Sequence, residues 1–156
     1  METKIPPPIV TLIFIFLIAF SNRIVEPFSF EFQMPLGVAI IICGLAVLIL
    51  AVRVFKQLET TINPMQPSQA SKLAITGPFK FTRNPMYLGM SIMLIGFGVI
   101  FGAKLTVCLL ALFVLYITIF QIMPEERAME QKFDDWEDYS AKVRSGYKYE
   151  LRICFI

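Results

Sequence analysis

Four apolar stretches, separated by short polar segments, dominate the pattern of the chain. They are Ile9–Phe20, Met34–Val52, Met86–Phe101 and Leu105–Met123. A helix needs about 20 apolar residues to cross a bilayer, or about 17 at the short end. The second and fourth stretches reach this length, and the third reaches it when its flanks are included. We therefore predict four transmembrane helices, the last two joined by a tight hairpin at Gly102-Ala103-Lys104.

The first stretch has a second interpretation. With Lys4 ahead of it and Ala19-Phe20-Ser21 behind it, it also resembles a signal peptide. Because the chain contains Met1, we expect the stretch to be retained as a helix.

The segment after the last apolar stretch, residues 124–143, has the pattern of a single amphipathic helix. At 100° per residue one stripe is apolar and the opposite face is acidic. The stripe contains Met129, Phe133, Trp136, Val143 and Tyr147, and the opposite face contains Asp134, Glu137, Asp138 and Ala141. Glu125 and Glu126 straddle the stripe, so both are expected to face inward at the bilayer boundary.

These two glutamates have two interpretations. Pro124-Glu125-Glu126 is either an acidic first turn that answers the helix dipole or part of a site. A carboxylate near hydrocarbon costs up to about 2.5–3.5 kcal/mol at the bilayer centre, and less toward the interface. This cost favours a partner, such as Arg83 or a bound cation.

Composition agrees with a membrane protein. Of the 156 residues, 56% are hydrophobic and 17% are charged, and the mean hydropathy is +0.68, outside the usual balance of a soluble domain. No Ser/Gly-rich linker or repeat divides the chain, so we predict one domain over residues 1–156. Its fold class is expected to be all-α: an integral membrane bundle of about four transmembrane helices with a cytoplasmic amphipathic C-terminal helix. The chain has no histidine and its three cysteines lack metal-site spacing, so no metal is predicted.

The positions of the basic residues predict the orientation in the membrane. Of the 14 lysines and arginines, only Arg23 and Lys104 fall outside if both termini are cytoplasmic. The loop 53–85 and the tail 124–156 then share the cytoplasmic face and can build one site. We predict a multi-pass membrane protein with membrane lipids as neighbours and no nucleic-acid partner, and leave its oligomeric state open.

Residues 75–89, ITGPFKFTRNPMYLG, place basic and aromatic side chains directly before the third apolar stretch. Asn84-Pro85 predicts a helix start, with the Asn84 side chain accepting free backbone N–H groups and proline at the first helical position. The aromatic and basic residues are alternatively an interfacial belt and positive-inside anchors. Anchoring does not explain why Arg83 lies at the positive end of a helix, where a shared anion is favourable. We therefore expect a carboxylate or phosphate there.

Two groups of residues together carry a resemblance to a known family. They are Thr76-Gly77-Pro78-Phe79 with Arg83-Asn84-Pro85-Met86-Tyr87 before the hairpin, and Glu125-Glu126, Phe133, Trp136 and Tyr139 after it. In this order the chain resembles the superfamily of isoprenylcysteine carboxyl methyltransferases and phospholipid N-methyltransferases. The resemblance covers about residues 55–144.

The resemblance implies a membrane enzyme with its catalytic core in residues 55–156 that uses S-adenosylmethionine. It implies a methyl acceptor that is lipid-like or isoprenoid-linked. The cofactor-binding residues carried over by motif are Gly77, Pro78, Phe79, Lys80, Phe81, Thr82, Asn84, Tyr87, Glu125 and Glu126. The catalytic residues carried over are Arg83, Tyr87 and Glu125.

The acceptor is left open between two chemical classes. Methylation of a carboxylate releases no proton, so the absence of histidine favours it. A lipid amine must lose a proton, for which Glu125, Glu126 or Tyr87 are the candidates. Two other functions are considered: a membrane reductase that uses NADPH, and a non-catalytic membrane adaptor.

Overall fold

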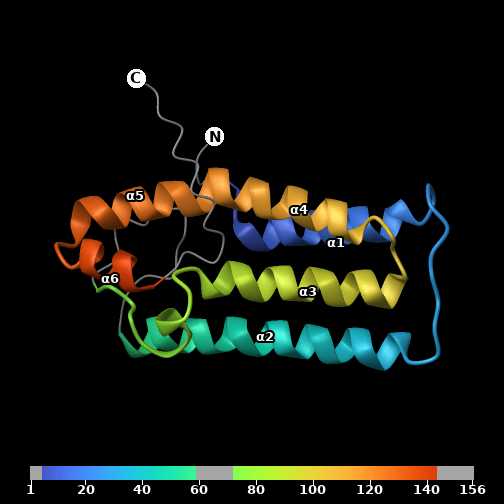
Figure 1. Cartoon of the computed structure of the whole chain (residues 1–156), viewed down its shortest axis with the longest axis horizontal. Coiled ribbons are helices and arrows are strands. Elements are labelled where there is room, and N and C mark those ends of the chain that lie inside the picture. Colours follow the sequence, from blue (N-terminus) through green and yellow to red (C-terminus); the bar gives the residue numbers. More distant parts are fainter. Residues whose placement is uncertain (1–4, 59–71, 144–156) are drawn as a thin grey trace, which may run out of the picture.

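The computed structural model describes residues 5–58 and 72–143, and all regular structure in these ranges is helical. Figure 1 shows the helices running lengthwise, side by side, with a short helix folded back at one end. The elements are α1 (Pro7–Ser21), α2 (Gln33–Gln57), the 3₁₀ turn η2 (Gly77–Lys80), α3 (Pro85–Phe101), α4 (Thr106–Ile117), the π-turn η3 (Thr118–Ile122), α5 (Met123–Lys132) and α6 (Trp136–Lys142). The all-α prediction is confirmed.

Two helices of the described chain are long and apolar enough to cross a membrane. They are α2, with 25 residues, and the continuous rod formed by α4, η3 and α5, Thr106–Lys132, with 27 residues. Only 17% and 28% of their most apolar windows are buried inside the protein, so most of this apolar surface faces outward. The exposed side chains include Leu12 and Phe16 on α1 as well. Such broad exposed apolar surface is typical of a membrane-associated protein.

The two shorter apolar helices, α1 and α3, have 15 and 17 residues. They agree in position with the predicted first and third stretches; α1 is shorter than a span, and α3 has only the length of the shortest spans. The count of four transmembrane helices stays a prediction.

Helices α2 and α3 touch along four glycines, which we call the glycine seam: Gly37, Gly44, Gly89 and Gly96. A Cβ atom placed on Gly44 would lie 2.7 Å from the carbonyl oxygen of Gly89, and one placed on Gly37 would lie 2.9 Å from that of Gly96. The absence of side chains lets the backbones approach closely, as small residues do in membrane helix pairs. The seam therefore fixes α3 against α2.

The predicted hairpin between α3 and α4 is confirmed. Gly102 has a φ of 64°, a left-handed conformation that glycine adopts without strain. The last carbonyl groups of α3 are also satisfied from outside the helix, because Asn22 Nδ2 donates to Phe101 O at 2.7 Å and Gln33 Nε2 donates to Ile100 O at 3.1 Å. These hydrogen bonds close this end of the bundle.

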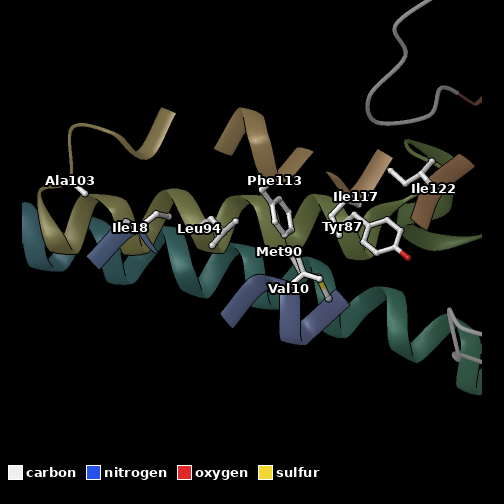
Figure 2. Close-up of a cluster of buried hydrophobic side chains, with 9 residues drawn as sticks. All are labelled: Val10, Ile18, Tyr87, Met90, Leu94, Ala103, Phe113, Ile117 and Ile122. Atoms are coloured by element: carbon white, nitrogen blue, oxygen red, sulfur yellow. The ribbon is translucent and has the colours of Figure 1, made fainter. Parts of the chain in front are cut away.

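The main hydrophobic core lies between α1, α3 and the α4 rod. Figure 2 shows its buried side chains in a row along the bundle axis, with Tyr87 and Ile122 at one end and Ala103 at the other. The row consists of Val10, Ile18, Tyr87, Met90, Leu94, Ala103, Phe113, Ile117 and Ile122. A second cluster, Ala51, Val54, Ala74 and Phe79, packs η2 against the end of α2.

The segment after the last apolar stretch differs from the prediction of one amphipathic helix over 124–143. Helix α5 continues from α4 through η3, and Phe133 has an extended backbone (φ −118°, ψ 118°) that ends it before α6. Pro124 explains the π-turn, because proline has no N–H to donate and clashes with the carbonyl four residues earlier. The N–H of Met123 bonds to Thr118 O instead. The prediction of one continuous helix over 124–143 is wrong because α5 and α6 are separate helices, and Tyr147 of the predicted stripe lies outside the described residues.

Candidate functional site

The site lies at the bundle end where η2 and the starts of α3, α5 and α6 meet (Figure 1). Gly77 has a φ of 59° and Pro78 follows it, so the chain turns tightly into η2. Phe79 anchors the turn, since its ring meets that of Phe55 at 5.2 Å, edge to face. The hydroxyl of Tyr139 donates to Phe79 O at 2.9 Å and fastens α6 to the same turn. These contacts hold the segment that carries Arg83.

Arg83 is the centre of the polar contacts. Its Nη2 donates to Glu126 Oε2 at 3.2 Å, and its Nε lies 3.1 Å from Glu126 Oε1 as an ion pair without hydrogen-bond alignment. Nη1 donates to Ser140 O at 3.3 Å, and the guanidinium carbon lies 5.5 Å from the centre of the Trp136 ring. The side chains of Arg83 and Glu126 are 11% and 26% exposed, so the pair is largely shielded from water. The anion expected at the start of α3 is thus Glu126.

Asn84 occupies the N-cap position of α3, with Pro85 first in the helix, as predicted. Its side chain does not cap the helix, contrary to the prediction. Nδ2 donates instead to Glu126 Oε1 at 3.4 Å. A second carboxylate contact has replaced the local cap, so Asn84 belongs to the same polar cluster as Arg83.

Glu125 faces a different partner from Glu126. The hydroxyl of Tyr87 donates to Glu125 Oε1. Glu125 lies after Met123, where the apolar part of the rod ends, and it is therefore outside the stretch expected in the bilayer. Burial raises the pKa of its carboxyl to about 8; the hydrogen bond from Tyr87 acts against this, and the charge of Glu126 acts with it.

A groove of about 330 Å³ opens between α5 and α6. Its lining residues are Arg83, Met123, Glu126, Arg127, Glu130, Trp136 and Ser140. The four from α5 are spaced i, i+3, i+4 and i+7, which is one face of a helix. The groove therefore offers both signs of charge beside an indole ring, at a volume near the lower end of the about 300–1,000 Å³ range of ligand sites.

The predicted site residues divide into three sets. The structure brings Arg83, Asn84 and Glu126 together and pairs Tyr87 with Glu125 beside them. Two others are buried in supporting roles: Phe79 packs in the second cluster, and Thr82 Oγ1 accepts from the Asn84 N–H at 3.3 Å. The rest of the turn lies outside the groove lining: Gly77, Pro78, Lys80 and Phe81, the last of which is 85% exposed.

Five groove residues were not among the predicted site residues: Met123, Arg127, Glu130, Trp136 and Ser140. The spacing of Glu126, Arg127 and Glu130 on one helical face was available as a signal. Trp136 falls on the predicted apolar stripe only if residues 124–143 form one unbroken helix, whereas it begins the separate helix α6. Within the described ranges, no group of three or more His, Cys, Asp or Glu side chains is arranged to hold a metal ion.

The family model for phospholipid methyltransferases matches residues 32–135, two thirds of the chain. The matched range begins at α2 and includes Arg83, Tyr87 and both glutamates, while Trp136 and Ser140 lie just beyond it. Neither the curated proteins nor the solved structures gave a match.

Proposed function

Because the chain belongs to the phospholipid methyltransferase family, and is thus a membrane methyltransferase acting on lipid-related substrates, we propose that it takes its methyl group from S-adenosylmethionine. The acceptor in this proposal is a lipid-like or isoprenoid-linked molecule. The observation that carries the proposal is the groove in which Arg83 lies between Glu126 and Trp136.

The residues of the groove fit the charges of this cofactor. S-adenosylmethionine carries a carboxylate, an ammonium, a sulfonium and an adenine ring. The Arg83 guanidinium suits the carboxylate, the Glu126 carboxylate suits the ammonium, and the Trp136 ring offers an aromatic surface for stacking. All three elements of recognition therefore meet in one groove.

When bound, the cofactor supplies an activated methyl group on a positively charged sulfur. The protein has to hold the two reactants in line and exclude water. Arg83 and Asn84 fix the orientation of Glu126, while Tyr87 fixes that of Glu125. Tyr87 and Glu125 are the side chains we assign to the reacting end, nearest the apolar core.

We place this site at the cytoplasmic surface of a four-helix membrane bundle with both termini on that side. The lengthwise arrangement of α1 to α4 supports this, because the α3–α4 hairpin, which contains Lys104, lies at the opposite end of the bundle from α6 (Figure 1). A water-soluble cofactor and an apolar acceptor meet at such an interface.

Two classes of acceptor differ in whether Glu125 has to accept a proton during methyl transfer. A carboxylate acceptor releases no proton, which the absence of histidine favours. An amine acceptor is favoured by a specific observation: the buried carboxyl of Glu125, held by Tyr87, has a pKa near that of a general base at neutral pH. Glu125→Gln should slow methylation of an amine and leave that of a carboxylate unchanged.

Isothermal titration tests the cofactor assignment. Wild-type protein in detergent should bind S-adenosylmethionine, and Arg83→Ala should weaken this binding roughly ten- to hundredfold, since charge-assisted hydrogen bonds contribute about 1.5–3 kcal/mol. Asp138→Asn is the control, because Asp138 is exposed on α6 and does not line the groove. Unchanged affinity in Arg83→Ala would refute the site. Binding of NADPH would favour a reductase, and binding of neither cofactor would favour an adaptor.

A further inference from the structure

The short helix α6 depends for its position on contacts from another part of the chain. It has seven residues, fewer than the about 12–15 below which an isolated helix is only marginally stable in water. The residues that flank it, Phe133 and Val143, have extended backbones (φ −118° and −114°), so α6 is not a continuation of α5. Trp136 and Ser140 of α6 nevertheless line the groove. The shape of the groove therefore depends on what fixes α6.

Three contacts join α6 to the segment that contains η2 and Arg83. Arg83 Nη1 donates to Ser140 O at 3.3 Å, and the guanidinium carbon lies 5.5 Å from the centre of the Trp136 ring. The hydroxyl of Tyr139 donates to Phe79 O at 2.9 Å, and the ring of Tyr139 meets that of Trp136 edge to face at 5.9 Å. Two of the three contacts thus depend on Arg83, and the third depends on Tyr139.

A ligand carboxylate would compete with α6 for Arg83. The bond from Nη1 to Ser140 O, at 3.3 Å, is longer than the about 2.9–3.0 Å that is usual for an N–H···O bond. A carboxylate forms shorter, charge-assisted bonds that are roughly twice as strong, and it engages a guanidinium through two N–H groups. In the proposed function this carboxylate belongs to S-adenosylmethionine. Binding of the cofactor therefore weakens the contacts by which Arg83 holds α6.

The hydrogen bond of Tyr139 does not face this competition, because neither Tyr139 nor Phe79 lines the groove. Phe79 is packed in the second cluster, with its ring 5.2 Å from that of Phe55, so its carbonyl oxygen is a fixed acceptor. Burial raises the pKa of the Tyr139 hydroxyl from 10.0 to about 12, so the hydroxyl keeps its proton at neutral pH and remains a donor. This bond can hold α6 when Arg83 is engaged by a ligand.

We propose that Tyr139 is a positioning residue for cofactor binding: its bond to Phe79 O keeps α6, and Trp136 with it, beside the groove while a ligand carboxylate occupies Arg83. This inference rests on the proposed methyltransferase function for the identity of that ligand. Tyr139 acts through the indole ring of Trp136 and not by touching the cofactor. Its effect is larger in the ligand-bound protein, because Arg83 also holds α6 when no ligand is present.

A double-mutant cycle tests these contacts without any cofactor. Trp136 is the only tryptophan of the chain, so acrylamide quenching of the intrinsic fluorescence measures how far this ring is exposed. In the full chain in detergent, Tyr139→Phe and Arg83→Ala should each raise the quenching only slightly, because one set of contacts remains in each. The double variant should raise it by more than the sum of the two single changes. An increase no greater than that sum overturns the proposal.

Addition of S-adenosylmethionine tests the role in binding. In Tyr139→Phe the quenching of Trp136 should rise when the cofactor is added, whereas in wild-type protein it should not. Isothermal titration should show an affinity about two- to tenfold lower in Tyr139→Phe, the usual effect of losing one hydrogen bond between neutral groups. Quenching that is raised in Tyr139→Phe before the cofactor is added, and does not rise further with it, indicates a merely structural role and overturns the proposal.

Tyr116→Phe is the matched control for the loss of a tyrosine hydroxyl. Tyr116 belongs to α4, its ring packs against that of Phe120, and it does not line the groove. Its replacement should leave both the quenching and the affinity for S-adenosylmethionine unchanged. An equal loss of affinity in Tyr116→Phe and Tyr139→Phe overturns the proposal.

The two sets of measurements separate this inference from the function on which it rests. If wild-type protein binds no S-adenosylmethionine, the proposed function fails, and the cofactor-free cycle still decides whether Tyr139 holds α6 in place of Arg83. If the cofactor binds wild-type protein and Tyr139→Phe with the same affinity, the proposed function stands and the positioning role of Tyr139 fails.

Discussion

Two consecutive glutamates of this protein have different environments. Successive residues of a helix point about 100° apart, so Glu126 reaches Arg83 and Asn84 while Glu125 reaches Tyr87. Glu126 forms an ion pair with Arg83 beside the groove, whereas the Glu125 carboxyl accepts a hydrogen bond from the Tyr87 hydroxyl. One dipeptide therefore supplies both an ion pair and a protonatable carboxyl.

The buried carboxyl predicts how stability depends on pH. The pKa of Glu125 is raised from 4.5 to about 8 in the folded protein, so the folded state binds more protons than the unfolded state between these values. The resulting stabilisation is present below about pH 4.5 and is lost as the pH rises toward 8. Thermal unfolding of the detergent-solubilised protein should therefore show a midpoint that falls over this interval.

Glu125→Gln, which mimics the protonated carboxyl, should flatten the fall. Glu130→Gln provides the comparison, since Glu130 is an exposed carboxylate on the same helix. A wild-type midpoint with the same pH profile as Glu125→Gln would contradict the assignment.

At single positions, the sequence predicted which kind of chemical group lies beside a residue better than it predicted which residue supplies that group. An anion beside Arg83 follows from the charge of a helix start, and it is present as Glu126. Whether Glu125 or Glu126 pairs with Arg83 depends on how α5 packs against the start of α3, and no local sequence pattern predicts that packing. The same docking draws the Asn84 side chain away from its cap toward Glu126.

Among the contacts between helices, the glycine seam requires one particular residue type, glycine, because the backbones of α2 and α3 touch there. Gly44→Ala should destabilise the protein by about 1–3 kcal/mol, because the added methyl meets the backbone oxygen of Gly89 at 2.7 Å and neither backbone can yield without separating α2 from α3. Chemical denaturation in detergent measures the loss. Ala46→Val, on an exposed position of the same helix, should change stability by less than about 0.5 kcal/mol. Equal effects of the two changes would mean that the seam is not a close contact in solution.

Helix ends were predictable where glycine or proline encodes them. Asn84-Pro85 begins α3, and Gly102 ends it. The end of α5 has no such signal, because Phe133-Asp134-Asp135 contains neither residue and continues the helical pattern. Instead, hydrogen bonds to residues distant in sequence fix the position of α6. The Tyr139 hydroxyl donates to Phe79 O, and Arg83 donates to Ser140 O. The groove depends on this reversal, so its outer wall could not be derived from periodicity.

For the whole molecule, the proposed four-helix topology makes a test of sidedness possible. In a chain with Cys43, Cys108 and Cys154 replaced by alanine, Glu26→Cys and Lys104→Cys should react with a membrane-impermeant thiol reagent from outside. Lys80→Cys and Asp138→Cys should react only in inverted vesicles. All four positions are exposed and lie outside the helices α1 to α4. Labelling of Lys80→Cys and Lys104→Cys from one side would contradict a crossing by α3.

The length of the continuous rod from α4 to α5 bears on where the groove lies relative to the hydrocarbon layer of the membrane. Its 27 residues extend for about 40 Å at 1.5 Å per residue, whereas the hydrocarbon layer is about 30 Å thick. In the proposed topology, with the rod upright in the bilayer, an excess of about 10 Å projects into the aqueous phase at the charged end after Met123. The proposed topology therefore places the groove in the aqueous phase, within reach of a water-soluble cofactor, and leaves the acyl tail of the acceptor in the hydrocarbon layer.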